Sequence, residues 1–281
     1  MLRAKKFIYL IFIVLNFNFI YSQGKFNFKN EDKRAVTLKF KSVNNLIIVS
    51  GILNGKFINF LLDTGVNKTK IFGNVKDSTF LKSAQFISLR SIGSSEPVKA
   101  YKTIDNTIDL GPVSGNNFEV YYITDPRFDL SSKLGVNVQG IIGYDFFKNF
   151  IVRVNYSRKN LRIYQRDKFN RKLRRFDKID FRFIRKKPHI KLPVEFLDGT
   201  KNELVFLLDT GSSDAFWIFE NEEISIPENS FTDYVGYGLE LAVEGERSKA
   251  KSLHVGKFKL KEPQVAYLDS LSAKLVTLDR F

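Results

Sequence analysis

Short apolar runs alternate with clusters of Gly, Asn, Asp and Ser along most of the chain. The runs are rich in Val, Ile, Phe and Tyr and recur about every ten residues, a spacing typical of β-sandwiches and barrels. Helical periodicity is weak, and the best candidate is a short helix over 146–149. The pattern therefore predicts an all-β protein.

One apolar run ends in the same way twice. The sequence Phe-Leu-Leu-Asp-Thr-Gly occurs at 60–65 and again at 206–211. Upstream of each copy, β-type runs flank a two-residue turn signal: Asn-Gly at 54–55 and Asp-Gly at 198–199. Both dipeptides tolerate the positive φ of a type I′ turn, so each copy is predicted to end the second strand of a β-hairpin. Each hairpin then presents one aspartate, Asp63 or Asp209, at its tip.

The similarity continues downstream of the two aspartates. Gly111 follows Asp63 by 48 positions, and Gly256 follows Asp209 by 47. Strand-like runs at 118–122 and 264–267 come after these glycines in both copies. A slip of one residue over that length predicts two homologous halves, so the fold is interpreted as two similar units.

The first half also contains Gly-Ile-Ile-Gly-Tyr-Asp-Phe-Phe at 140–147, followed by apolar runs at 150–156 and 161–164. With the paired Asp-Thr-Gly, these residues resemble the retropepsin-like aspartic proteases of the pepsin and retropepsin superfamily, especially the bacterial envelope type. The resemblance covers 46–165 well and 189–281 in part. It implies two β-barrel or sandwich lobes related by pseudo-twofold symmetry.

The second half departs from that pattern. The repeat offset of 146 residues places a second Gly-x-x-Gly at about 286–289, beyond Phe281. We therefore expect a second lobe that is incomplete at its C-terminus. The predicted domains are a first lobe over 23–170, a basic linker over 171–187 and a second lobe over 188–281.

Residues 1–22 are predicted to be a signal peptide. Arg3, Lys5 and Lys6 precede an apolar stretch at 7–21, which is shorter than the roughly 20 residues that span a bilayer. An uncleaved anchor is the alternative. Either reading predicts an exported protein, located in the periplasm, at the cell envelope or outside the cell.

The net charge of +15 is concentrated in one region. Residues 153–187 hold fifteen Lys or Arg and three Asp. The simplest interpretation is a solvated linker between the halves; the alternative is weak contact of 171–187 with an anionic envelope surface. We expect no nucleic-acid partner for an exported protein.

Composition excludes several kinds of chemistry. The chain has no cysteine and two histidines, which excludes disulfides and thiolate metal sites and leaves little for a zinc site. It also lacks a Gly-x-Ser-x-Gly elbow, a Walker phosphate loop and a Gly-x-Gly-x-x-Gly fingerprint,. We expect neither a metal nor an organic cofactor.

Two adjacent carboxyls can perform acid and base catalysis together. At a separation of about 3 Å they cannot both ionise, so they share one proton. We predict Asp63 and Asp209 as this catalytic pair. Supporting residues are predicted in the same loops: Thr64, Gly65, Thr210, Gly211 and Ser212. The resemblance implies that the two threonines join the loops across the pseudo-twofold axis.

The resemblance also implies a hairpin flap over the cleft. Residues 86–89 and 98–104, with a turn around 93–97, can form it. Tyr101 is the candidate substrate contact in this hairpin, although a tyrosine there more often packs on its own strand.

Three functional hypotheses follow. The first is an exported aspartic endopeptidase that uses Asp63 and Asp209 on a peptide or protein substrate. The second is a homodimeric protease built from lobe one alone. The third is a catalytically weak or inactive protease-fold module that binds peptides or serves the envelope. Monomer and homodimer are both left open.

Overall fold

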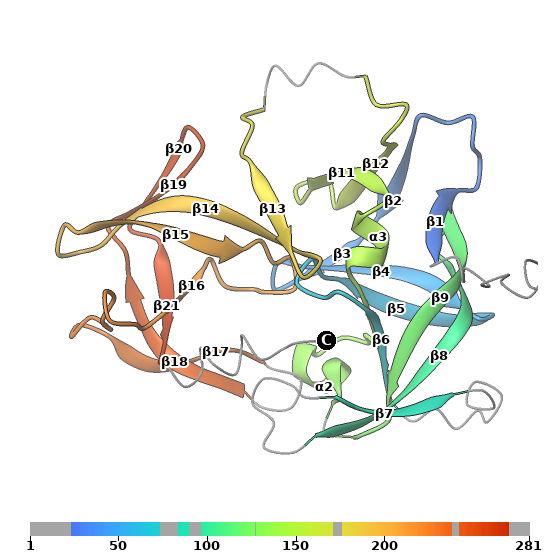
Figure 1. The fold of residues 1–281 in the computed structure, drawn as a ribbon, viewed down its shortest axis with the longest axis horizontal. Helices are drawn as coiled ribbons and strands as arrows, with labels where there is room; N and C mark the ends of the chain where they lie inside the picture. The colour runs from blue at the N-terminus through green and yellow to red at the C-terminus, as the bar shows by residue number, and fades with distance from the viewer. Residues whose placement is uncertain are drawn as a thin grey trace, which may run out of the picture.

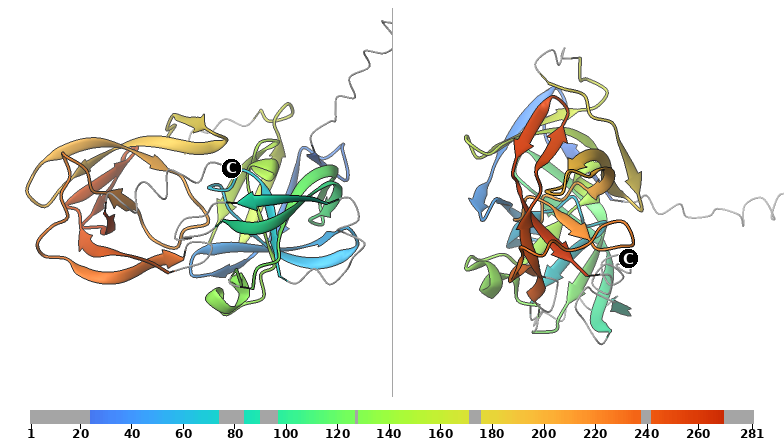
Figure 2. Two further views of the ribbon diagram at one scale, coloured as in Figure 1. Left: turned by 60° about the horizontal axis from the view of Figure 1, so that its bottom comes forward. Right: turned by 90° about the vertical axis from the view of Figure 1, so that its left-hand side faces the viewer.

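The computed structural model describes residues 24–73, 84–89, 97–126, 128–170, 176–237 and 242–269. The predicted signal peptide at 1–22 lies outside these residues. The described chain is mostly β, with two short helices, and forms two lobes side by side (Figure 1). Figure 2 shows the same separation from a second direction. No helix within the described ranges is both long and apolar enough to cross a membrane.

The first lobe is built on a nine-stranded sheet and a three-stranded sheet. The large sheet has the order β1-β9-β6-β10-β5-β4-β8-β7, with β3 paired to β4, and the small sheet has the order β11-β12-β2. The strands of the large sheet are β1 (Lys25–Phe28), β3 (Lys41–Val43), β4 (Leu46–Leu53), β5 (Lys56–Leu62), β6 (Thr69–Phe72), β7 (Gln85–Leu89), β8 (Val98–Asp109), β9 (Val113–Ile123) and β10 (Gly140–Ile142). Those of the small sheet are β2 (Ala35–Lys39), β11 (Phe150–Asn155) and β12 (Asn160–Gln165).

The core of the first lobe lies between these two sheets. Alternate apolar residues of the small sheet, such as Leu161 and Ile163, pack against Phe26, Ile47 and Phe60 of the large one. The two helices are α2 (Leu130–Leu134) and α3 (Tyr144–Phe147). Helix α3 is the predicted helix, shifted by two residues, and it contacts both β1 and β11.

The second lobe has two separate sheets among its described residues. One contains β13 (Phe181–Ile184), β14 (Lys187–Glu195), β15 (Lys201–Leu207), β19 (Ser252–Val255) and β20 (Phe258–Lys261). The other contains β16 (Trp217–Phe219), β17 (Phe231–Tyr237), β18 (Ala242–Lys249) and β21 (Gln264–Leu268). Leu192, Val194, Ile218 and Val265 lie in the core between them.

One strand distinguishes the two lobes. In the first, β10 pairs in parallel with β5 and antiparallel with β6, which joins the two parts of the large sheet. In the second, β16 pairs in parallel with β21, as β6 does with β9. No strand of the described part of the second lobe lies between β15 and β16.

Side-chain burial reflects this difference. Phe60 and Leu62 at the end of β5 are fully buried, whereas the equivalent residues of the second copy, Phe206 and Leu208, are half-buried and 49% exposed. The apolar run before Asp-Thr-Gly is therefore buried in the core of the first lobe and partly exposed in the second.

Both predicted hairpins form, but their turns differ. Asn54 and Gly55 have φ of 48° and 82°, as expected for a type I′ turn, and β4 pairs with β5 in the predicted register. In the second hairpin Gly199 has φ of 89° and Asp198 is not left-handed. The amide of Gly199 donates to the carbonyl of Phe196, so this loop is a longer turn that ends in a left-handed glycine.

The predicted linker extends too far into the second lobe. Residues 181–184 form β13, and Arg185 and Lys186 form a turn with φ of 51° and 66° that leads into β14. Aromatic and basic residues alternate in this segment, as they can in an exposed strand. The high density of charge led to its interpretation as a linker instead. The ring of Phe183 lies edge-on to that of Tyr144 in α3, 5.7 Å away, so β13 contacts the first lobe.

The predicted flap strands pair with each other. β7 pairs antiparallel with β8 between Gln85↔Lys102 and Leu89↔Val98, while the turn at 90–96 lies outside the described residues. The second lobe has a comparable antiparallel hairpin of β17 and β18.

Candidate active site

The two Asp-Thr-Gly loops follow equivalent strands. Asp63 follows β5, and its amide donates to the carbonyl of Ile142 in β10 (3.0 Å). Asp209 lies two residues beyond the end of β15, and the amide of Leu208 before it donates to the carbonyl of Pro188 (2.9 Å). In Figure 1, β15 points from its own lobe toward the first lobe. Both loops therefore meet where the lobes meet.

Two threonines join the loops by four hydrogen bonds. The amide of Thr64 donates to Oγ1 of Thr210 (3.2 Å), and the amide of Thr210 donates to Oγ1 of Thr64 (3.0 Å). Each hydroxyl in turn donates to a carbonyl of the opposite loop, Thr64 to Leu208 (2.6 Å) and Thr210 to Leu62 (2.9 Å). This interlock is symmetric and holds the two aspartates in a fixed relation.

The glycines bring the carboxyls together. The amide of Gly65 donates to Oδ1 of Asp63, and that of Gly211 to Oδ1 of Asp209, both at 2.7 Å. Each glycine also faces the opposite aspartate. A Cβ on Gly65 would lie 2.8 Å from Oδ2 of Asp209, and one on Gly211 would lie 2.3 Å from Cγ of Asp63. A side chain at either position would occupy the space of the other carboxyl.

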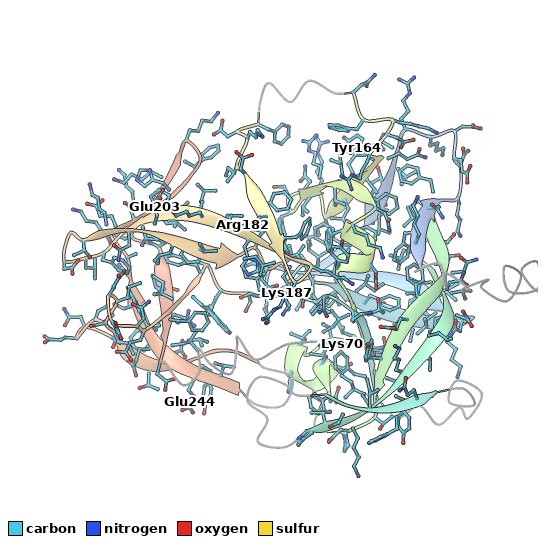
Figure 3. The ribbon with its side chains drawn as sticks, viewed as in Figure 1. Lys70, Tyr164, Arg182, Lys187, Glu203 and Glu244 are labelled. Atoms are coloured by element: carbon cyan, nitrogen blue, oxygen red, sulfur yellow. The ribbon has the colours of Figure 1, made fainter. Side chains whose placement is uncertain are left out.

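The pKa of the Asp63 carboxyl is raised well above its usual range. Burial is the largest cause, since Asp63 is 8% exposed, and the charge of Asp209 and a side-chain hydrogen bond with Asp209 add to it. The Gly65 amide and the positive charge of Lys70 act in the opposite direction. Lys70, labelled in Figure 3, is itself buried on β6. The site therefore favours a protonated carboxyl beside Asp209.

The remaining predicted residues have other surroundings. Ser212 is half-buried, and no hydrogen bond joins it to either carboxyl among the described residues. Val66, which has no side-chain donor, is held by its backbone, since its carbonyl accepts from the amide of Tyr144 (2.9 Å). Tyr101 packs against the first-lobe core and lies edge-on to Phe86 (5.9 Å). A role for Tyr101 in substrate binding remains a prediction.

An ion network lies behind the first loop. Lys68, five residues after Asp63, and Lys102 on β8 both bind Glu119 on β9, the latter at 2.7 Å. Burial acts to raise the pKa of Glu119, but hydrogen bonds from Lys102, Lys68 and Tyr121 outweigh it and lower the pKa to about 2. The network thus connects the Asp63 loop to the strand that forms the flap hairpin.

The second lobe has a network in the corresponding place with the charges reversed. Asp214, five residues after Asp209, accepts from Nη1 of Arg247 (2.9 Å) and from Nε1 of Trp217 (2.8 Å). Arg247 on β18 also binds Asp233 on β17 through Nε (3.1 Å). Arg247 and Asp214 are 12% and 16% exposed, so this pair is largely shielded from water.

Sequence reasoning missed both networks. Charged residues five positions after each aspartate were visible in the sequence, but their partners lie 33 to 51 positions further along. No cluster of three or more potential metal ligands occurs in the described ranges.

One family model matches the segment that contains the first loop. Residues 49–146 match the family model described as aspartyl protease; this segment contains Asp63 and the Gly-Ile-Ile-Gly stretch. A retropepsin-like aspartic protease from Rickettsia conorii is similar in structure, with 11% identity over 50% of this chain and 92% of that chain and a TM-score of 0.31. No curated protein matches the chain. Residues 49–146 are thus similar to the aspartyl protease family.

Proposed function

We propose that this protein is an exported aspartic endopeptidase whose catalytic pair is Asp63 and Asp209. The observation that carries the proposal is the interlock of the two Asp-Thr-Gly loops. The hydroxyls of Thr64 and Thr210 bond across the lobes, and each glycine faces the opposite carboxyl. The segment that matches the aspartyl protease family supplies the first aspartate.

The proposed mechanism uses one water molecule and one shared proton. An ionised carboxylate takes a proton from water as the water attacks the peptide carbonyl carbon, while the protonated carboxyl donates its proton to the carbonyl oxygen. The carbon–nitrogen bond of the tetrahedral intermediate then breaks as the carboxyl that took the proton from water gives it to the leaving nitrogen, and the other carboxylate takes a hydroxyl proton from the intermediate, which restores one proton to the pair. The raised pKa of Asp63 suits the proton donor at the start of this cycle, although the two carboxyls titrate as a pair.

The substrate class is an extended peptide. Main-chain hydrogen bonds to strand edges bind such segments in many complexes. Both lobes offer a hairpin for this purpose, β7–β8 in one and β17–β18 in the other. Figure 1 draws the two hairpins along the same lower side of the molecule. We propose that the peptide binds between these hairpins and against the two aspartates.

Export is part of the proposal and depends on the sequence of residues 1–22. The positive start, the apolar stretch and its short length support a signal peptide,. Fractionation of cells that express the full chain, with amino-terminal sequencing of the product, tests this independently of activity. A full-length chain recovered from the cytoplasm would contradict export.

Cleavage of a denatured protein is the direct test of the enzymatic function. Asp63→Asn and Asp209→Asn should each abolish it, and a transition-state-mimicking inhibitor of aspartic proteases should block the wild type. Asp180→Asn is the matched control, because its carboxylate is 87% exposed on the second lobe. Full cleavage by either dyad variant would show that the paired mechanism is wrong.

A peptide-binding module without catalysis is the second candidate. It is favoured by the second loop, because β15 pairs with β14 and with no other described strand, and Leu208 is 49% exposed. Peptide binding by wild type and by Asp209→Asn alike, with no product from either, would support this candidate. The homodimeric version is less favoured, since the threonine interlock forms within one chain; sedimentation of active protein as a dimer would revive it.

A further inference from the structure

A group of arginines lies on the small sheet of the first lobe. Arg153 on β11 and Arg162 on β12 are direct cross-strand partners, and Thr37 on β2 is the partner of Arg162 on its other side. All three residues point away from the core, because Val152 and Leu161 next to them face inward. A third guanidinium, that of Arg158, comes from the β11–β12 turn and lines the same depression.

This placement of charge is unfavourable by itself. Like charges directly opposite each other on antiparallel strands destabilise the pair. Within the described part of the chain, no carboxylate forms an ion pair with Arg153, Arg158 or Arg162. Nη1 of Arg162 instead donates to Oγ1 of Thr37 (2.8 Å). Three positive charges thus share one face without a negative partner among the described residues.

The depression also has neutral hydrogen-bonding groups and a defined shape. Its volume is about 220 Å³, and Asn155, Asn160 and Tyr164 complete its lining. Since a water molecule occupies about 30 Å³ in the liquid, the space can hold a tetrahedral oxyanion. Tyr164 is labelled in Figure 3, where it marks this sheet on the upper side of the first lobe.

Aromatic contacts restrict the side chains at the rim. The guanidinium of Arg153 lies over the ring of Phe176, 5.8 Å from its centre, and the ring of Tyr164 lies 5.1 Å from that of Phe169. Such contacts limit the freedom of Arg153 before any ligand binds, which lowers the cost of ordering it.

We propose that Arg153, Arg158 and Arg162 form a binding site for a phosphate group. Guanidinium groups bind phosphate oxygens through paired N–H donors, and several of them match a multiply charged tetrahedral anion better than a single carboxylate. The site lies on the far side of the first-lobe core from the main sheet, outside residues 171–187. It is independent of the proposed protease activity.

Calorimetric titration of the full chain with inorganic phosphate, with chloride held constant, tests the site. Arg153→Gln/Arg162→Gln should weaken binding at least tenfold. The control Arg182→Gln/Arg185→Gln removes the same charge from the exposed β13 hairpin and should leave the affinity within about twofold, the change expected from long-range charge alone. Phosphate should also raise the melting temperature of wild type and control, and not that of the Arg153/Arg162 variant.

A second arm distinguishes a lipid headgroup from free phosphate. Vesicles of phosphatidylglycerol in phosphatidylcholine are sedimented with each protein. Loss of vesicle binding in the Arg153/Arg162 variant alone identifies a headgroup as the source, and phosphate binding without vesicle binding identifies a soluble ligand. Equal losses in both double variants, or no binding in either arm, would overturn the proposal.

Discussion

The threonine interlock gives the sharpest quantitative prediction. Thr210→Val keeps the shape of the side chain and removes its hydroxyl. Two hydrogen bonds disappear, the one donated to the carbonyl of Leu62 (2.9 Å) and the one accepted from the amide of Thr64 (3.2 Å). Each contributes about 0.5–1.5 kcal/mol, and an unpaired part-buried group adds about 1 kcal/mol or more. We therefore expect a loss of about 2–4 kcal/mol in the free energy of unfolding.

Thr69→Val is the matched control for this change. Thr69 is fully buried on β6, and its Oγ1 has no hydrogen-bond partner among the described residues. Removal of that hydroxyl should therefore be neutral or stabilising. Thr210→Ser, which keeps the hydroxyl, should recover most of the stability lost in Thr210→Val.

Urea unfolding followed by circular dichroism and by fluorescence provides the assay. Trp217 is the only tryptophan of the chain, so its emission reports on the second lobe. Thr64→Val should cost as much as Thr210→Val, and the double variant should cost less than the sum, because the first change already loosens the loops. Equal stability of the Thr210→Val and Thr69→Val variants would refute the reasoning.

Three further predictions concern the site and its support. Folding raises the pKa of Asp63, so the contribution of this carboxyl to stability is full below the unfolded pKa and is lost as pH rises through the folded pKa. The Asp63→Asn variant should therefore gain stability relative to wild type as pH rises from about 4. The gain in the free energy of unfolding, measured by urea titration, should be at most about 1.4 kcal/mol per pH unit. Gly211→Ala places a Cβ 2.3 Å from Cγ of Asp63 and should abolish cleavage. The control Gly55→Ala is strained at φ of 82°; it should lose about 1 kcal/mol in the free energy of unfolding and stay active. Arg247→Met leaves Asp214 and Asp233 without their cation and should cost about 1–3 kcal/mol, discounted for partial exposure; an unchanged midpoint and Trp217 emission would contradict it.

Local signals made the hairpins before the two aspartates predictable. Asn-Gly and Asp-Gly between apolar runs determine chain reversal within a few residues, and the strands on both sides formed as expected. The repeated Asp-Thr-Gly also identified the residues that meet at the interlock. Helix α2 was missed, although Asp129 caps its start and Gly135 ends it; its five residues are too few to show a helical period.

Pairings between distant segments were not predictable in the same way. The partner of Asp214 is Arg247 and that of Lys68 is Glu119, and nothing in the local pattern selects these among the many Lys, Arg, Asp and Glu of the chain. The strand β13 was hidden because basic residues at exposed positions resemble a linker. Long-range registers of this kind are determined by packing of the whole sheet.

The two aspartates differ in what lies behind them, and this asymmetry follows from β10. In the first lobe the carbonyl of Ile142 in β10 accepts a hydrogen bond from the Asp63 amide, and the amide of Tyr144 at the start of α3 donates to the carbonyl of Val66. The last three residues of β5 are buried, and Asp63 after them is only 8% exposed. In the second lobe no described strand takes that place beside β15, so Asp209 stays half-buried. Since burial is the largest cause of the raised pKa of Asp63, the strand that supports the first loop also contributes to that rise.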